Sequence, residues 1–235
     1  MGTWSPDGSR IIFASNDSGE YDLYQKLANG VAPEEVLLKS SDDKVPTSWS
    51  PDGRFLLYQS EWDSRNAPPN ATKEGLWVLP LEGDKKSFLF ESTGSNTDEG
   101  QFSPNGRLIA YVSSESGRNE IYVRTFSPAT AATAAEAGGK WLISTAGGTQ
   151  PRWRGDGKEL YYLAPDGMLM AVDISESLVF HAGVPKTLFR APLHVGAVSE
   201  NHWDVTRDGK RFLFAAESTQ GPFTVVLNWP SLLKK

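Results

Sequence analysis

Three histidines are the first candidates for chemistry, because imidazole is the side chain that most readily exchanges a proton near neutral pH. They are His181, His194 and His202. His202 precedes Trp203 and Asp204, so a serine, a histidine and an aspartate could meet in space as a nucleophilic triad. The chain contains no Gly-x-Ser-x-Gly nucleophile elbow, however. We therefore interpret the histidines as loop or strand-edge residues, and we assign no catalytic residue.

A cluster of oxygen-bearing side chains is the second candidate. It consists of Asn16, Asp17, Glu20 and Asp22. Carboxylate and amide oxygens suit Ca²⁺, but the spacing differs from that of an EF-hand loop, and the glycine falls at the wrong position. The cluster is interpreted as a solvated turn, and Asp42 with Asp43 as a charged connection. We expect neither a metal nor another cofactor.

A five-residue turn motif, written five times, must organise whatever site exists. Residues 49–53 read Trp-Ser-Pro-Asp-Gly, and residues 4–8 are identical. Proline presets φ at the second position of a type I turn, Asp or Asn suits the next, and a left-handed Gly follows. The motif residues of the five copies are Trp4, Pro6, Asp7, Gly8, Trp49, Pro51, Asp52, Gly53, Phe102, Pro104, Asn105, Gly106, Trp153, Asp156, Gly157, Asp208 and Gly209.

The spacing of the motif predicts a repeat architecture. Successive copies begin 45, 53, 51 and 52 residues apart, and a basic residue and an apolar run follow each turn. Each repeat also contains two further apolar runs, except that the last one has a single further run, at residues 224–227. Four short strands per repeat are typical of one blade of a β-propeller. We predict a single all-β propeller domain with repeats at about 1–44, 45–97, 98–148, 149–200 and 201–235.

The last repeat leaves the closure of the ring open. Its third strand is expected at residues 223–229, and the proline-led tail that follows is a poor fourth strand. Either the last blade is three-stranded in a five-bladed ring, or the chain is part of a longer propeller. Within residues 1–235 alone, 223–229 would form an exposed edge; in a longer propeller, residues upstream of position 1 would add the outer strand.

Composition excludes several classes of partner. The 235 residues carry a net charge of −6, which argues against a nucleic-acid or anionic-membrane surface. No apolar run approaches membrane-spanning length, so direct membrane insertion is not expected. There is no cysteine, so neither disulfides nor a cysteine-based metal site can form.

The motif, followed by a basic residue and an apolar strand, resembles the WD-like propeller repeat of TolB-type proteins. Gly-Gly-Thr-Gln-Pro-Arg-Trp at 147–153, with residues 34–39, 46–49, 99–102 and 157–162, is similar to the C-terminal sensor propeller of bacterial membrane-anchored Ser/Thr protein kinases. These resemblances imply a periplasmic or extracytoplasmic location, a protein partner, and a membrane-anchored kinase domain upstream. The chain has no kinase motif of its own, so kinase activity is not implied.

The mouth of the propeller channel is the predicted binding site. Side chains just before the in-phase aromatic of the last three repeats should reach it: Glu99, Gln101, Gln150, Arg152, His202 and Asp204. The aromatics themselves, Trp4 included, are predicted to pack between blades. The long connections at 61–74 and 190–201 should share one face of the ring, and the loop at 127–139 the other.

We expect non-catalytic binding of a protein or peptide. The alternative is an enzyme or an enzyme-associated propeller, either glycoside-acting or the gating domain of a prolyl-oligopeptidase-type peptidase. Glu99 and Asp204 would be the carboxylates of a glycoside-acting site if they faced each other across the channel, roughly 5–10 Å apart. We favour solvated rim carboxylates.

Overall fold

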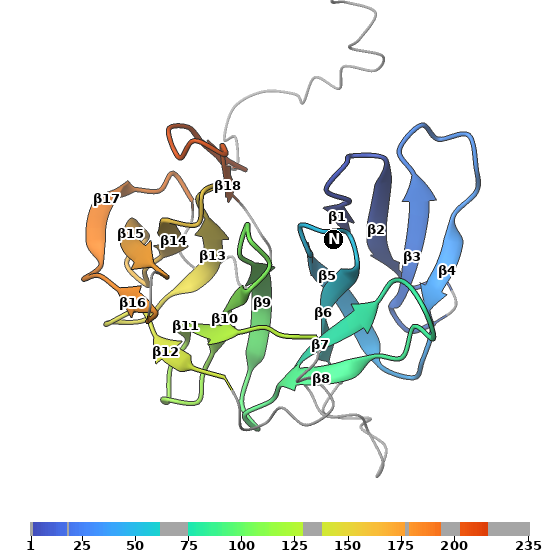
Figure 1. The fold of residues 1–235 in the computed structure, drawn as a ribbon, viewed down its shortest axis with the longest axis horizontal. Coiled ribbons are helices and arrows are strands. Elements are labelled where there is room, and N and C mark those ends of the chain that lie inside the picture. Colours follow the sequence, from blue (N-terminus) through green and yellow to red (C-terminus); the bar gives the residue numbers. More distant parts are fainter. Residues whose placement is uncertain are drawn as a thin grey trace, which may run out of the picture.

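The protein forms a series of antiparallel sheets around a common axis (Figure 1). This computed structural model describes residues 2–17, 19–61, 75–128, 138–176, 179–193 and 203–215. All regular elements in these ranges are strands, so the chain is an all-β propeller, as the sequence predicted. The same ranges contain no helix long and apolar enough to cross a membrane.

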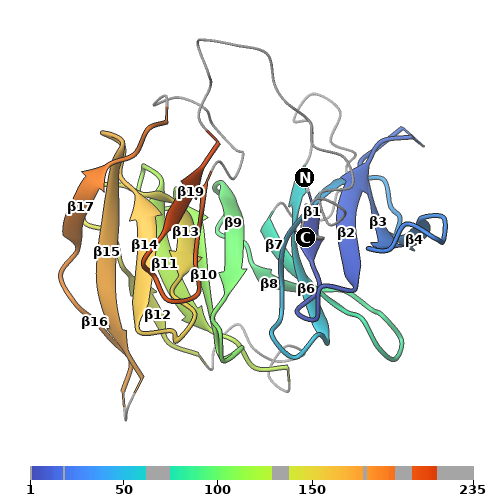
Figure 2. The ribbon, with the colours of Figure 1, turned by 90° about the horizontal axis from the view of Figure 1, so that it is seen from above.

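The first three sheets have four strands each, paired in chain order. The first contains β1 (Gly2–Trp4), β2 (Arg10–Ser15), β3 (Asp22–Leu27) and β4 (Glu35–Leu38). The second contains β5 (Asp43–Trp49), β6 (Phe55–Glu61), β7 (Gly75–Pro80) and β8 (Phe88–Glu91). The third contains β9 (Thr97–Phe102), β10 (Leu108–Ser113), β11 (Glu120–Thr125) and β12 (Lys140–Leu142). In Figure 2, β1 and β9 lie near the centre, and β4 lies at an outer edge.

The last two sheets depart from the four-stranded pattern. The fourth contains β13 (Thr149–Trp153), β14 (Glu159–Leu163), β15 (Met168–Ser175), β16 (His181–Ala182) and β17 (Lys186–Arg190). Both β16 and β17 pair with β15, because β15 is long enough to take two partners along one edge. The fifth sheet is the hairpin of β18 (Trp203–Val205) and β19 (Phe212–Phe214). The third strand predicted at 223–229 lies outside the described residues, as do positions 62–74, 129–137 and 194–201 of the predicted loops.

The motif turn is held by a hydroxyl that sequence reasoning overlooked. Ser50 Oγ donates to Asp52 Oδ1 at 2.6 Å and accepts from the Phe55 backbone N–H at 2.9 Å. Gly53 has φ of 77°, the predicted left-handed conformation. The same serine or threonine bridge recurs in the first, third and fifth turns. In the fourth turn Arg154 replaces the hydroxyl and pairs with Asp156 at 2.7 Å.

The core lies between sheets, because the in-phase aromatics Trp49, Phe102 and Trp153 pack against the preceding sheet. Phe102 contacts the cluster of Leu57 and Leu76 of the second sheet, and Trp153 packs on apolar side chains of the third. The prediction was wrong for Trp4, which is 57% exposed. Among the described residues, β18 and β19 do not pack closely against β1, so no sheet covers Trp4.

Asn16, Asp17 and Glu20 of the oxygen-rich loop are exposed, as a solvated turn predicts, but Asp22 is not. Asp22 is 1% exposed, and its Oδ1 accepts hydrogen bonds from the Ser40 backbone N–H at 3.1 Å and from Lys44 Nζ at 3.3 Å. Lys44 also donates to the Asp42 carbonyl, and Asp42 is itself buried. This buried ion pair joins the first sheet to the second. Within the described ranges, no group of three or more His, Asp or Glu side chains is placed to hold a metal ion.

Candidate functional site

An open cavity of about 630 Å³ lies on the axis of the ring. The innermost strand of every sheet contributes to its wall, which is why the cavity is central. These contributions are Thr3 from β1, Thr47 from β5, Gln101 from β9, Arg152 from β13 and Asp204 from β18. Apolar surface comes from Trp4, Trp203, Leu213 and Phe214. The cavity therefore offers polar and aromatic groups together, as small-ligand and peptide sites usually do.

Arg152 places a buried cation in the cavity wall. Only 9% of the residue is exposed, and its guanidinium lies 5.8 Å from the centre of the Trp203 ring. Its Nη1 donates to the Pro151 carbonyl at 2.7 Å, and its Nε lies 3.9 Å from Asp204 Oδ1. Burial lowers the pKa of Arg152, while the Asp204 and Glu99 carboxylates raise it. Arginine stays charged in proteins, so the cavity wall keeps a cation, which the exposed Asp204 and the buried Glu99 compensate in part.

Trp203 contributes a buried donor to the same wall. The residue is 3% exposed, and its indole Nε1 has no hydrogen-bond partner within the described part of the chain. A buried polar group without a partner costs about 1–3 kcal/mol, so native structures rarely leave one. Trp203 therefore places an unsatisfied donor in the layer of residues that lines the cavity.

Hydrogen bonds between sheets fix the cavity wall. Gln101 Nε2 donates to the Thr47 carbonyl at 3.1 Å, and Trp153 Nε1 donates to the Gln101 carbonyl at 3.2 Å. The Phe102 backbone N–H donates to Ser48 Oγ at 3.1 Å. The second, third and fourth sheets are thus linked at the level of the cavity, and this part of the wall is preorganised.

Glu99 and Gln150 do not line the cavity, although the sequence placed them at its mouth. Both lie at β-bulges, where an extra residue interrupts the pairing of an innermost strand. They have φ of 53° and 54°, and their side chains are buried. The bulge withdraws both residues from the channel surface, and Glu99 Oε2 accepts a hydrogen bond from the Gln150 backbone N–H at 2.5 Å.

The Glu99 carboxyl is the most perturbed acid of the site. Burial raises its pKa to about 7, and the neighbouring Asp98 charge adds to that rise. The hydrogen bond from Gln150 and the Arg152 charge act in the opposite direction. A carboxyl that titrates near neutrality is a common feature of functional sites, but buried structural networks produce it too.

The structure brings together Gln101, Arg152 and Asp204 of the predicted set. His202 and His194 lie outside the described residues, and His181 lies exposed on the outer strand β16. Sequence reasoning missed Thr3, Thr47 and Trp203 as wall residues. Thr3 could have been found, because it precedes its in-phase aromatic just as Gln101 does; Thr47 could not, because a bulge shifts the register of β5.

No family model matches the chain, and no curated protein matches it. Solved structures do resemble it. TolB from Acinetobacter baumannii superposes with a TM-score of 0.69 at 17% identity, covering 93% of this chain and 48% of that one. A structure described as TolB from Agrobacterium tumefaciens gives 0.62 at 18% identity, covering 80% and 64%. The chain therefore spans about half to two thirds of these TolB structures.

An enzyme also shares the fold. A puromycin-hydrolysing peptidase from Mycobacterium tuberculosis superposes with a TM-score of 0.55 at 16% identity, covering 79% of this chain and 30% of that one. At such identities the likeness concerns the fold alone, since one fold hosts many functions. These comparisons establish a TolB-like β-propeller fold.

Proposed function

We propose that the chain is a non-catalytic propeller that binds a protein partner by taking a short peptide segment into the axial cavity. The observation that carries the proposal is the pairing of two buried donors in one open cavity wall, the Arg152 guanidinium and Trp203 Nε1. A peptide carbonyl or carboxylate would satisfy both. The exposed face of Trp4 would pack against a peptide side chain.

The resemblance to TolB-type propellers supports a protein as the partner. The narrower motif resemblance to kinase-linked propellers supports a finer proposal, in which the chain is the extracytoplasmic sensor part of a membrane-anchored signalling protein. The partner then reports an external condition by occupying the cavity. Expression with and without the natural upstream sequence, followed by fractionation, would test this location.

An enzyme is the second candidate, favoured by the peptidase of similar fold. Hydrolysis of nitrophenyl glycosides and of peptide nitroanilides would test it. Turnover that is lost in Asp204→Asn would support catalysis. Absence of turnover for all substrates would leave binding as the function of the cavity.

Selection of peptides from a phage-displayed random library on the full chain tests the binding proposal. Asp204→Lys replaces the exposed carboxylate that partly neutralises Arg152 with a cation, so it should change the affinity of the selected peptides by roughly tenfold or more. Glu35→Lys, an equal charge change on the outer strand β4, is the matched control and should have no effect. Selected peptides that bind both variants as tightly as the unmodified chain would place their site elsewhere and contradict the proposal.

A further inference from the structure

Two asparagines, Asn29 and Asn105, are directly followed by glycine, and this pairing is chemically labile. The backbone nitrogen of the glycine can attack the side-chain carbonyl carbon of the asparagine, so that ammonia leaves and a cyclic succinimide forms. Water then opens the ring to aspartate or isoaspartate. Glycine favours the attack, because it has no Cβ to obstruct the approach of its backbone nitrogen. The proposed function involves neither asparagine.

Asn29 lies in the turn that joins β3 to the outer strand β4 (Figure 1). Asn29 and Gly30 are both exposed. Gly30 has φ of 70°, and a Cβ added there would meet no atom within 4 Å. In the described part of the chain the Asn29 side chain makes one hydrogen bond, in which Oδ1 accepts from the Val31 backbone N–H at 3.1 Å. The side chain is therefore folded toward the following amides and is otherwise unrestrained.

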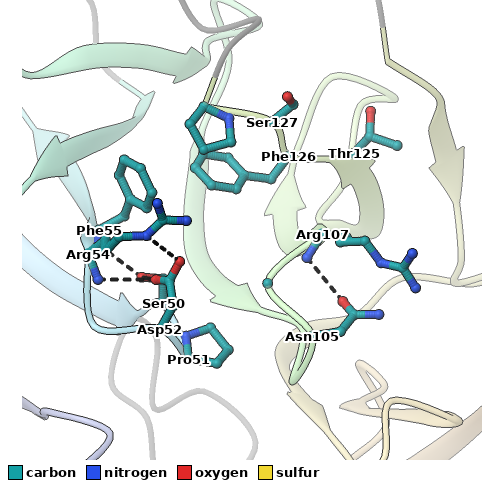
Figure 3. A pocket seen from close by; sticks show the side chains of 12 residues that line it. Ser50, Pro51, Asp52, Arg54, Phe55, Asn105, Arg107, Thr125, Phe126 and Ser127 are labelled. Atoms are coloured by element: carbon teal, nitrogen blue, oxygen red, sulfur yellow. Dashed lines mark hydrogen bonds and ion pairs between the residues drawn. The ribbon is translucent and has the colours of Figure 1, made fainter.

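Asn105, in contrast, is held at both ends of its side-chain amide. Its Oδ1 accepts from Ser103 Oγ at 2.8 Å and from the Arg107 backbone N–H at 3.0 Å, the bond that is dashed in Figure 3. Its Nδ2 donates to Glu176 Oε1 at 3.0 Å, and Glu176 follows β15 of the fourth sheet. A rotation that brings the carbonyl carbon to the glycine nitrogen would break these bonds.

The backbone of the two turns differs in the same direction. The Gly106 N–H donates to the Ser103 carbonyl at 2.8 Å, whereas the Gly30 N–H donates to the Leu27 carbonyl at 3.1 Å. A Cβ added at Gly106 would lie 3.5 Å from Pro51 of the neighbouring turn. The attacking nitrogen of the third motif turn is thus held more firmly than that of the β3–β4 turn.

We propose that Asn29 is a site of spontaneous deamidation in the folded protein and that the fold protects Asn105. The Gly30 nitrogen loses its proton to solvent base and bonds to Asn29 Cγ, and Nδ2 leaves as ammonia. Hydrolysis of the succinimide gives aspartate or isoaspartate. Both products add a negative charge to the turn, and isoaspartate also adds a methylene group to the main chain between β3 and β4. An exposed isoaspartate is a substrate for a carboxyl methyltransferase specific for that residue.

The test is incubation of the full chain in mildly alkaline buffer, with and without guanidinium chloride, followed by tryptic digestion and mass spectrometry. The folded protein should modify Asn29 roughly tenfold or more faster than Asn105, since two further side-chain hydrogen bonds must break at Asn105. The unfolded chain should modify both at similar rates, because both precede glycine. Methyl transfer from S-adenosylmethionine by an isoaspartyl methyltransferase would measure the isoaspartate that forms.

Substitutions at Glu176 test the protection of Asn105. Glu176→Ala should speed modification of Asn105 by roughly two- to fivefold, since it removes one hydrogen bond to the leaving nitrogen. Glu176→Gln can still accept that bond, so it is the matched control and should have a smaller effect. Neither variant should alter Asn29, whereas Gly30→Ala should slow it. Equal rates at the two asparagines in the folded protein, or a faster rate at Asn105, would overturn the proposal. An unchanged rate at Asn105 in Glu176→Ala would overturn the proposed protection.

Discussion

At the residue scale, a substitution at Gly53 measures the free-energy cost of a left-handed backbone conformation without other effects. A Cβ added at this position meets no atom within 4 Å, so a side chain would change only the backbone energy. We predict that Gly53→Ala lowers the free energy of unfolding by about 1 kcal/mol. Urea denaturation would measure it. Gly53→Asn is the control, since asparagine tolerates this conformation better, and its loss should be smaller. Equal losses would show that φ is not the cause.

Glu99 gives a second prediction, for the dependence of stability on pH. Its folded-state pKa of about 7 lies above the ordinary value of 4.5, so the folded state holds the proton more tightly than the unfolded chain. The contribution of Glu99 to the free energy of unfolding is fully present below pH 4.5 and is lost as pH rises through 7. The free energy of unfolding should fall by on the order of 2–3 kcal/mol across this window.

Glu99→Gln separates this effect from that of other titrating groups. The amide keeps an oxygen for the Gln150 backbone N–H but cannot ionise. The difference in unfolding free energy between unmodified chain and variant should therefore vary with pH between 4.5 and 7 and level off above. A constant difference across that range would mean that Glu99 titrates normally.

At the element scale, the in-phase aromatics show what local sequence does not contain. Trp153 and Trp4 occupy the same motif position, yet Trp153 packs on the third sheet and Trp4 is exposed. We predict that Trp153→Ala lowers the unfolding free energy by about 3 kcal/mol, since it removes buried aromatic surface. Trp4→Ala, which removes little buried surface, should cost well under half as much. Urea denaturation would measure both unfolding free energies. A loss in Trp4→Ala as large as that in Trp153→Ala would contradict the prediction, because it would mean that the first and last sheets close tightly over Trp4 in solution.

The repeated turn made the strand order predictable, because proline, aspartate and glycine act within five residues. Features that depend on distant partners were not predictable. Asp22 is buried because Lys44, 22 positions away, reaches it. Glu99 leaves the channel because a bulge adds one residue to β9. Of the five predicted site residues that the structure describes, Gln101, Arg152 and Asp204 line the axial cavity, because the alternation of side chains along an innermost strand is disturbed only at its bulge.

At the scale of the whole molecule, the axial cavity coincides with the place where the ring is least tightly packed. The innermost strands pack in succession from β1 to β18, whereas the described parts of the fifth sheet and β1 meet mainly across the cavity. Trp4, which no described strand of the last sheet covers, becomes part of the proposed binding surface. The same arrangement thus places an exposed aromatic side chain beside two buried donors of the cavity wall.

The central claim is that a peptide occupies this cavity and satisfies Trp203 Nε1. The most direct measurement is a ¹⁵N–¹H NMR spectrum of tryptophan-labelled full chain, titrated with a selected peptide and assigned by single Trp→Phe substitutions. The indole signal of Trp203 should shift downfield as its proton gains an acceptor, and that of Trp4 should shift with it. Trp141, which stacks on Phe180 away from the cavity, should not move. A shift of Trp141 with Trp203 unchanged would contradict the account.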